Sequence, residues 1–298
     1  MKKVILIVSM VLSCIGCTHE EPHSGCEGSL NLLFTCDGSV ADFDRLVGSD
    51  VELYLYDSEG KRIEQLHIPY ESIKGGRLYS LQWQHTGGLH LLAWTLSGKE
   101  DTGKKSPVFL GEEDYATARF SMGERAAGQL PGYHGSMQEL FLESVPFTRN
   151  LLEDRILHVD VKRQLCSVFV TIEEGKSFET QYPGALSVNI YGSSGSYKVA
   201  EGKQGGDRVV VGDTFSYVPG RDEYVAENKV MPASTDPATD LEDNIVVTLL
   251  EGGIARLSVD TEIKAQRGMQ IHVVIRPTKL EAVITVGSWQ IRKALAVL

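Results

Sequence analysis

Short segments in which apolar side chains recur at every second position follow one another along most of the chain. A period of two places alternate side chains on one buried face of a strand, and β-branched and aromatic residues favour that conformation. Many short strands at close spacing predict an all-β chain built of β-sandwiches rather than α/β units. The expected strands are 29–35, 51–56, 78–83, 89–96, 115–122, 138–142, 155–161, 165–172, 185–191, 208–217, 245–250, 256–263, 269–275 and 282–286.

Few segments depart from this pattern. Residues 39–46 predict a short helix and 112–115 a single helical turn, whereas the Gly-rich stretch 123–135 and the Pro-containing stretch 231–244 are typical of loops. The run 192–196, Gly-Ser-Ser-Gly-Ser, is predicted to be a hairpin loop. Further turns are expected at 57–60, 75–76, 87–88, 205–207 and 252–253, where Gly and Asp gather.

The N-terminus has the pattern of an export signal. Lys2 and Lys3 precede the apolar run 4–12, which is too short to span a bilayer and suits the hydrophobic region of a signal peptide. A small residue and a cysteine follow, and the next residues are polar. This order is typical of a bacterial lipoprotein, in which the first mature residue is a lipidated cysteine.

Two cysteines compete for that position. Cys17 follows Gly16, a small residue at the cut, and two acidic residues come soon after it. Cys14 follows Val-Leu-Ser, which also fits an apolar-x-small pattern, so Cys14 remains the alternative to the preferred Cys17. A redox Cys-x-x-Cys is disfavoured, because the pair adjoins the export signal and no βαβ pattern follows.

A domain boundary is expected near 145–150, where Pro146 interrupts the pattern and a new run of strands begins. After removal of the signal, the chain is long enough for two ordinary domains. The expected organisation is a signal peptide at 1–16, a tether at 17–27, an N-terminal β-sandwich domain at 28–147 and a C-terminal β-sandwich domain at 148–298.

The overall charge excludes some classes of partner. The formal net charge is −11, which argues against nucleic-acid binding and against electrostatic adhesion to anionic lipid. Beyond the signal, no apolar run is long enough to span a membrane. Too few cysteines remain for a disulfide scaffold, although Cys26 and Cys36 are a possible pair. Cys166 lies on the apolar face of its strand and is expected to be a buried small hydrophobe.

Catalytic and metal-binding patterns are weak throughout. There is no Gly-x-Ser-x-Gly elbow, no P-loop and no Gly-x-Gly-x-x-Gly. His85 and His90 are spaced poorly for a metal, and the acidic cluster within 236–243 lacks the spacing of a calcium loop. Trp83 and Trp94 are expected in the core, with a carbohydrate-stacking platform as the alternative. We therefore expect no enzyme activity, no catalytic residues, no metal and no cofactor.

Several stretches, in order along the whole chain, resemble the fimbrial anchor (minor fimbrial subunit) family of Bacteroidales, which belongs to type V fimbriae. His90 stands where a Tyr is usual in that family, and Phe147 replaces a Leu. The stretches that carry the resemblance are Cys17 and Cys26 followed by the strand 30–34, the strand and turn 51–60, the Gly-to-Trp strand 88–94, Phe147-Thr148-Arg149, and the closing strand 284–289 with its Trp.

The resemblance implies two transthyretin-like β-sandwich domains on a lipid (palmitate) tether at the outer membrane. Members of that family hold a fimbria to the cell surface and help set its length. The implied partners are the fimbrial stalk subunit, a fimbrillin, and the outer membrane through the lipid. Subunits of this type polymerise when one donates a strand to a neighbour's groove, in which backbone hydrogen bonds give affinity and alternate side chains fill pockets.

The C-terminal segment 287–298 is the candidate donor strand. Its alternate positions Trp289, Ile291, Leu295 and Val297 share one parity and are apolar, although Lys293 falls among them. The alternative is that the segment is the ordinary last strand of the second domain. The runner-up function for the whole chain is a surface lipoprotein that binds glycan or peptide, either as an adhesin or for nutrient capture.

Overall fold

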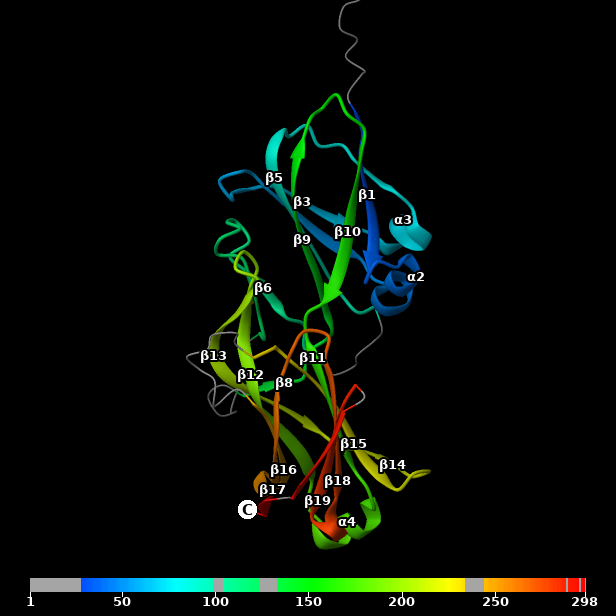
Figure 1. Cartoon of the computed structure of the whole chain (residues 1–298), viewed down its shortest axis with the longest axis vertical. Coiled ribbons are helices and arrows are strands. Elements are labelled where there is room, and N and C mark those ends of the chain that lie inside the picture. Colours follow the sequence, from blue (N-terminus) through cyan, green and yellow to red (C-terminus); the bar gives the residue numbers. More distant parts are fainter. Residues whose placement is uncertain are drawn as a thin grey trace, which may run out of the picture.

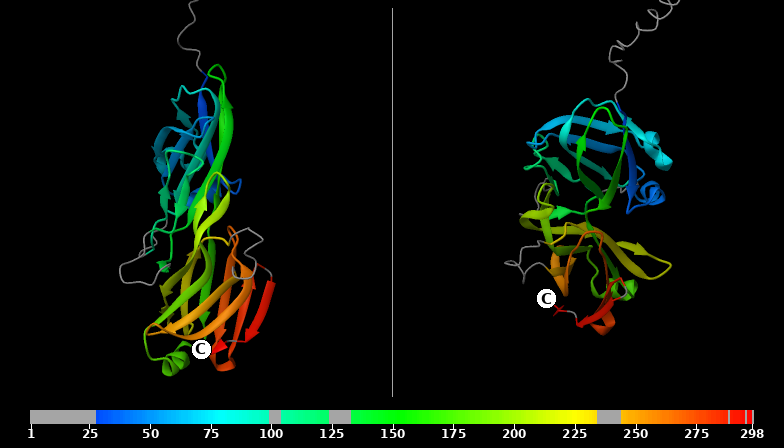
Figure 2. Two further views of the ribbon diagram at one scale, coloured as in Figure 1. Left: turned by 90° about the vertical axis from the view of Figure 1, so that its left-hand side faces the viewer. Right: turned by 45° about the horizontal axis from the view of Figure 1, so that its top comes forward.

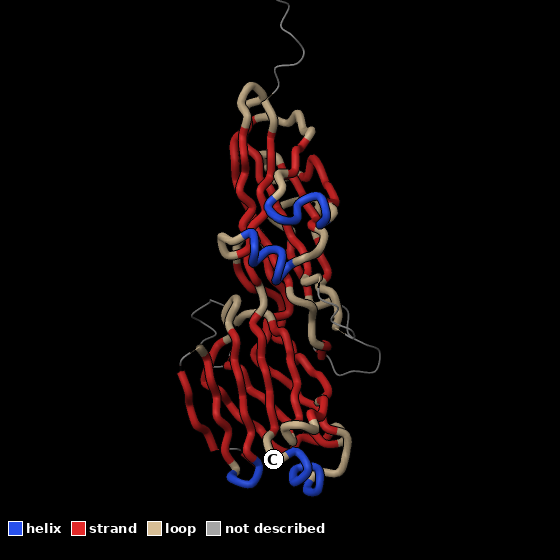
Figure 3. Tube along the Cα trace, turned by 90° about the vertical axis from the view of Figure 1, so that its right-hand side faces the viewer, coloured by secondary structure: helices blue, strands red, loops and turns tan. Residues whose placement is uncertain are grey.

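The protein is an elongated all-β molecule of two lobes placed end to end (Figure 1). The computed structural model describes residues 28–98, 104–123, 133–233, 244–287, 289–294 and 296–297. Within these ranges nearly all regular structure is strand, as the alternating pattern predicts, and the short helices lie at the margins of the sheets (Figure 3). The all-β class expected from the sequence is therefore confirmed.

A seven-stranded sheet with the order β3-β2-β5-β9-β10-β1-β4 forms the first lobe. Strand β10 joins its two halves, because β10 pairs with β1 from Arg155 to Val161 and then with β9 through Lys162 and Arg163. The sheet thus folds over on itself. The elements are β1 (Leu30–Cys36), α2 (Val40–Asp42), η1 (Phe43–Val47), β2 (Val51–Tyr56), β3 (Arg62–Ile68), α3 (Tyr70–Ile73), η2 (Lys74–Gly76), β4 (Tyr79–Leu81), β5 (Gly87–Leu96), β9 (Leu140–Arg149) and β10 (Arg155–Arg163).

Two sheets face each other in the second lobe, one ordered β14-β15-β11-β18-β19-β20 and the other β21-β17-β16-β12-β13-β8 (Figure 2). Their elements are β8 (Tyr133–Gly135), β11 (Cys166–Ile172), α4 (Gly175–Gln181), β12 (Leu186–Lys198), β13 (Lys203–Thr214), β14 (Ser216–Val218), β15 (Glu223–Val230), β16 (Asn244–Glu251), β17 (Ile254–Lys264), β18 (Gln270–Arg276), η4 (Pro277–Lys279), β19 (Glu281–Val286), β20 (Trp289–Ala294) and β21 (Ala296–Val297).

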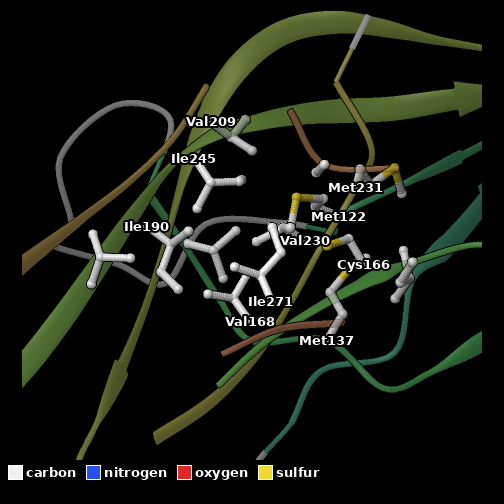
Figure 4. Packing of buried hydrophobic residues seen from close by; sticks show 14 of the residues in the cluster. Met122, Met137, Cys166, Val168, Ile190, Val209, Val230, Met231, Ile245 and Ile271 are labelled. Atoms are coloured by element: carbon white, nitrogen blue, oxygen red, sulfur yellow. The ribbon is translucent and has the colours of Figure 1, made fainter. Parts of the chain in front are cut away.

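Each lobe buries the apolar face of its strands. In the first lobe one cluster lies between the two halves of the folded sheet and includes Phe34, Leu53 and Val159. In the second lobe the facing sheets enclose a larger cluster, part of which is shown in Figure 4 around Cys166 and Ile190. The burial of Cys166 on its strand, expected from the sequence, is confirmed: its side chain is 0% exposed.

A hairpin of β6 (Val108–Leu110) and β7 (Arg119–Ser121) connects the lobes. Strand β7 is hydrogen-bonded to β12 of the second lobe, while the aromatic rings of the hairpin pack on the outer face of the first-lobe sheet. Phe109 and Phe120 stack with their centroids 4.7 Å apart, and Trp94 on β5 meets Phe120 edge-on at 5.3 Å. The ring of Tyr54 on β2 also meets that of Phe109, with their centroids 5.0 Å apart. The larger hydrophobic cluster therefore runs without a break from one lobe into the other.

The structure corrects several local expectations. Residues 192–196 are not a hairpin loop: they lie inside β12, where register shifts mark bulges, and the turn comes later, at 199–202. Likewise 205–207 lie inside β13. The glycines mark irregular strand pairing here, because a residue without a side chain admits a close backbone approach. The buried Ser193 hydroxyl accepts a hydrogen bond from the Met231 N–H at 3.0 Å.

Pro146 does not interrupt its strand either. It lies within β9 opposite His90 of β5, on the stretch where β9 has no partner on its other side, because β10 pairs only with Phe141 and Leu142. A proline is tolerated at such an edge, since no ladder hydrogen bond is lost there.

The sequence pattern did not predict four strands in the described part of the chain: β3, β6, β8 and β15. Strand β8 lies in the stretch expected to be a loop, and β3 is a mostly polar edge strand. In β15 the buried Asn228 and Lys229 hide the apolar alternation. The helices α3 and α4 were also not expected, whereas the short helix predicted over 39–46 is confirmed by α2 and η1.

We expect Phe120→Ala to lower the free energy of unfolding by about 3–5 kcal/mol, because it removes a fully buried ring from the junction between the lobes. Val108→Ala, on the same hairpin but 40% exposed, is the matched control and should change stability by less than about 1 kcal/mol. Chemical denaturation of both variants measures the difference. Equal effects would show that the aromatic cluster does not stabilise the junction.

Candidate functional site

Strand β1 occupies the middle of one half of the first-lobe sheet. It lies parallel to β10 on one side and antiparallel to β4 on the other. Its alternate side chains Leu30, Leu32 and Phe34 are buried in the core. The chain therefore passes directly from its N-terminal region into a strand that the core cannot release without losing two rows of backbone hydrogen bonds.

The start of β1 is fixed by Asp154 in the turn between β9 and β10. This carboxylate accepts hydrogen bonds from the backbone N–H of Ser29 at 2.7 Å and from the Ser29 hydroxyl at 2.9 Å. The backbone hydrogen bond from Ser29, together with that from its hydroxyl, holds the pKa of Asp154 below its ordinary value. The candidate lipidation residues Cys17 and Cys14 precede this point and lie outside the described residues, as does Cys26.

The C-terminal segment forms two strands. Strand β20 pairs antiparallel with β19, from Glu281 opposite Ala294 to Val286 opposite Trp289, and is the edge of the six-stranded sheet. Strand β21 then pairs with β17 at the edge of the opposite sheet, where Val297 lies opposite Leu257. The tail thus crosses from one sheet to the other.

The candidate donor positions have these places in the fold. Trp289 and Ile291 belong to β20 and Val297 to β21, whereas Leu295 lies outside the described residues. On β19, the strand with which β20 pairs, the side chains of Ala282 and Ile284 are buried. Release of the tail would uncover the edge of an apolar strand, which is the geometry that β-augmentation requires.

A buried group of charged side chains lies where the lobes meet. Lys229 on β15 is 7% exposed, and its ammonium lies 3.2 Å from the Glu139 carboxylate, 2.6 Å from that of Glu227 and 2.8 Å from the Ser167 hydroxyl. Arg163 on β10 approaches Glu139 at 3.5 Å. Burial raises the pKa of Glu139 above its ordinary value, against the attraction of Lys229 and Arg163. Sequence reasoning missed this group because its members lie far apart along the chain.

The described residues hold no group of three or more His, Cys, Asp or Glu side chains arranged to bind a metal ion. His85 hydrogen-bonds Glu64 at 3.1 Å, whereas His90 packs against the ring of Tyr115, so the two histidines do not converge. The acidic cluster within 236–243 lies outside the described residues. No helix among the described residues is long and apolar enough to cross a membrane.

The other candidate residues are buried or, in the case of Trp94, partly buried. Trp83 is 9% exposed and Trp94 belongs to the aromatic cluster, which leaves neither as an open stacking platform. Cys36 and Cys166 carry free, buried thiols, and burial raises the pKa of Cys36 to about 11 and that of Cys166 to about 12. Neither thiol is available as a thiolate at neutral pH.

The fold is thus a two-lobed arrangement of β-sheets in which β1 lies inside the first-lobe sheet and the C-terminal strands lie at sheet edges. Over residues 22–294 the sequence matches the family of Fimbrillin-A associated anchor proteins Mfa1 and Mfa2. The chain belongs to this fimbrial anchor family, as the sequence motifs suggested. No curated protein matches the sequence.

Three solved structures share the fold at low sequence identity. A candidate polysaccharide-binding protein from Bacteroides thetaiotaomicron has a TM-score of 0.64 at 16% identity, covering 90% of this chain and 98% of its own. A candidate adhesin from Bacteroides ovatus has a TM-score of 0.60 at 15% identity, covering 90% and 95%. The fimbrial anchor protein Mfa2 from Porphyromonas gingivalis has a TM-score of 0.51 at 12% identity, covering 89% and 99%.

Lys229→Met should lower the free energy of unfolding at pH 7 by about 3–5 kcal/mol, since it leaves the Glu139 carboxylate buried without its partner. Because the folded pKa of Glu139 is raised, a protonated Glu139 favours folding, and this contribution is lost as pH rises from about 4.3 through the folded pKa. Loss of the Lys229 charge, which lowers this pKa, raises the folded pKa of Glu139 further, so the cost of the substitution should grow between pH 4.5 and pH 7.

Lys198→Met is the matched control for that experiment, because Lys198 pairs with Glu201 at 2.9 Å on the surface. Its removal should cost no more than about 1 kcal/mol at either pH. Denaturant unfolding of both variants at the two pH values provides the comparison. A cost of Lys229→Met that does not change with pH would contradict the conclusion that Lys229 compensates the buried charge of Glu139.

Proposed function

We propose that this protein is a lipid-anchored fimbrial subunit that holds a fimbria to the outer membrane and limits its length. The observation that carries the proposal is the place of β1. A lipid on Cys17 would tether the strand that completes the first-lobe sheet, only eleven residues before Gly28. A strand held in this way cannot be removed to open a groove for another subunit, so this subunit would end the polymer.

The proposed partner is the fimbrial stalk subunit, and the proposed contact is strand exchange through the tail. Family membership supports an association with fimbrial subunits at the cell surface. The position of β20 at a sheet edge supports the tail as the mobile element. Because the same segment completes the second lobe in this conformation, exchange would require β20 and β21 to leave β19 and β17.

For the domain organisation we propose a signal peptide at 1–16, a tether at 17–27 and two domains, for which the sequence predicted a division at 147–148. The separate hydrophobic cluster of the first lobe supports an N-terminal domain, but position 147 lies within β9, and the first-lobe sheet and cluster continue through β10, so we propose that this domain extends to Arg163. The hairpin of β6 and β7 is then a part of that domain which adds to the sheet of the second lobe.

The second candidate is a surface lipoprotein that binds glycan. It is favoured by the fold shared with the candidate polysaccharide-binding protein from Bacteroides thetaiotaomicron. An open hollow lined by Gly135, Ser136, Asp213, Ser216 and Glu227 offers polar groups for such a ligand. Glycan-array binding by the purified chain, lost on Asp213→Asn, would support this function in place of anchoring.

Deletion of the gene in its native host tests the anchor. We expect long fimbrial polymer to be shed into the medium, to return to the cells with the wild-type gene, and to remain shed with Cys17→Ala. Cys14→Ala is the matched control and should restore attachment if Cys17 carries the lipid. Unchanged fimbriae in the deletion strain would remove the anchor function.

Substitutions at two neighbouring positions of β20 test the role of the tail. Ile291 pairs with Ile284 and Arg292 with Val283, so the two neighbouring positions face opposite sides of β20. If the variant protein reaches the cell surface at normal levels, Ile291→Asp should release polymer from the cells, because it places a charge among the alternate apolar positions of the tail. Arg292→Asp should not release polymer. Attachment that survives both Ile291→Asp and deletion of 287–298 would exclude the tail as the donor.

A further inference from the structure

Three segments meet at the end of the first lobe where the described chain begins. Leu30 at the start of β1 lies between Leu81 of β4 and Arg155 of β10. At the same end, Gly87 at the start of β5 lies opposite Arg149 at the end of β9. The start of β1, the loop 82–88 and the turn 150–154 therefore share one face, at the far end of the molecule from α4 (Figures 1 and 2). We call this face the proximal end.

The proximal end carries no net charge in a chain whose net charge is −11. Residues 28–31 and the loop 82–88 contain no Asp, Glu, Lys or Arg, and residues 149–156 contain two acidic and two basic side chains. Two acidic groups border these segments: Glu64 on β3, which hydrogen-bonds His85 at 3.1 Å, and the turn 57–60, where Ser58 approaches Gly88. A surface of this composition can approach a lipid headgroup layer without electrostatic repulsion.

Two large apolar side chains project from this neutral surface. Leu152, at the tip of the turn between β9 and β10, is 76% exposed, and Ile156 nearby is 50% exposed. The turn itself is ordered by hydrogen bonds: the Leu152 N–H donates to the Asn150 side-chain oxygen at 3.1 Å, and the Gly28 N–H donates to the Leu151 carbonyl at 2.5 Å. Leu152 is thus held outward by a turn that is bonded to the beginning of the described chain.

We propose that the proximal end rests on the surface of the lipid bilayer, with Leu152 at the boundary between headgroups and acyl chains. The proposal rests on the proposed lipid anchor in one respect: Gly28 is the eleventh residue after Cys17, which limits the distance between them to about 40 Å. A chain fixed at Cys17 therefore keeps Gly28 within about 40 Å of the membrane. Burial of an exposed apolar side chain at the interface then favours contact over free rotation on the tether.

Such a contact would orient the molecule. The proximal end and the end that carries α4 lie at opposite ends of the long axis, so a membrane-bound proximal end directs the second lobe and its C-terminal strands away from the membrane (Figure 1). The lipid would keep the protein at the membrane, and the contact through the proximal end would set its orientation.

A fluorescent probe at residue 152 tests this contact. Leu152→Cys is labelled with an environment-sensitive dye in a Cys26→Ser background, since Cys36 and Cys166 are 0% exposed. The matched control is Ile254→Cys, 60% exposed at the start of β17, next to the turn from β16 at the opposite end. With phosphatidylcholine vesicles containing nitroxide lipid, we expect the label at 152 to be quenched at least about twofold and the label at 254 to be unaffected.

The measurement is made on two forms of the protein. One is the lipidated chain, and the other is a chain in which a hexahistidine tag replaces Cys17 and binds it to nickel-chelating vesicles. Quenching at 152 in the tagged chain supports the contact even if the untagged chain fails to float with vesicles, a failure that would remove only the lipid anchor. Flotation with equal quenching at 152 and 254 would overturn the contact and leave the anchor intact. A spectral change at 152 that needs no vesicles and grows with protein concentration would assign the surface to a second copy, and would also overturn the proposal.

Discussion

The place of β1 between β10 and β4 is the constraint on which the rest of the structure depends. A strand in the middle of a sheet satisfies its backbone groups on both sides, and β1 also contributes Leu30, Leu32 and Phe34 to the core. Because the chain reaches β1 directly from its N-terminal region, a force applied to that region would act on the core of the first lobe. Force applied to the body of the protein would be resisted by two rows of hydrogen bonds and by the buried side chains.

The junction between the lobes extends that unit along the molecule. The hairpin of β6 and β7 is bonded to one lobe and packed on the other, so a relative rotation of the lobes would separate Trp94 from the rings of Phe109 and Phe120. The ion pair of Glu139 and Lys229 adds a polar contact in the same region. Buried ion pairs contribute little net stability but penalise alternative arrangements strongly, since a separated charge would lack a partner. Together these contacts favour one fixed arrangement of the two lobes.

The two ends of the molecule differ in chemistry. The proximal end is neutral, has an ordered turn and adjoins the start of the described chain, whereas the tail completes sheet edges of the second lobe. Sheet edges are the sites at which a β-protein most readily adds a strand from another chain. In the proposed function the proximal end faces the membrane and the tail contacts the polymer, and the proximal end lies at one end of the long axis while the tail belongs to the lobe at the other (Figure 1).

The sequence alone determined the all-β class, most strand positions and the burial of Cys166, because the alternation of apolar residues is a local property of the chain. Its motifs also indicated the fimbrial anchor family. Only the tertiary structure decided which strands pair. Asn228 and Lys229 conceal β15 because their polar side chains are buried, Pro146 is accepted because β9 is unpaired there, and residues 192–196 are held in β12 by neighbouring strands. The charged group at the junction and the neutral proximal end are equally invisible in the sequence, since both are assembled from segments that only long-range strand pairing brings together.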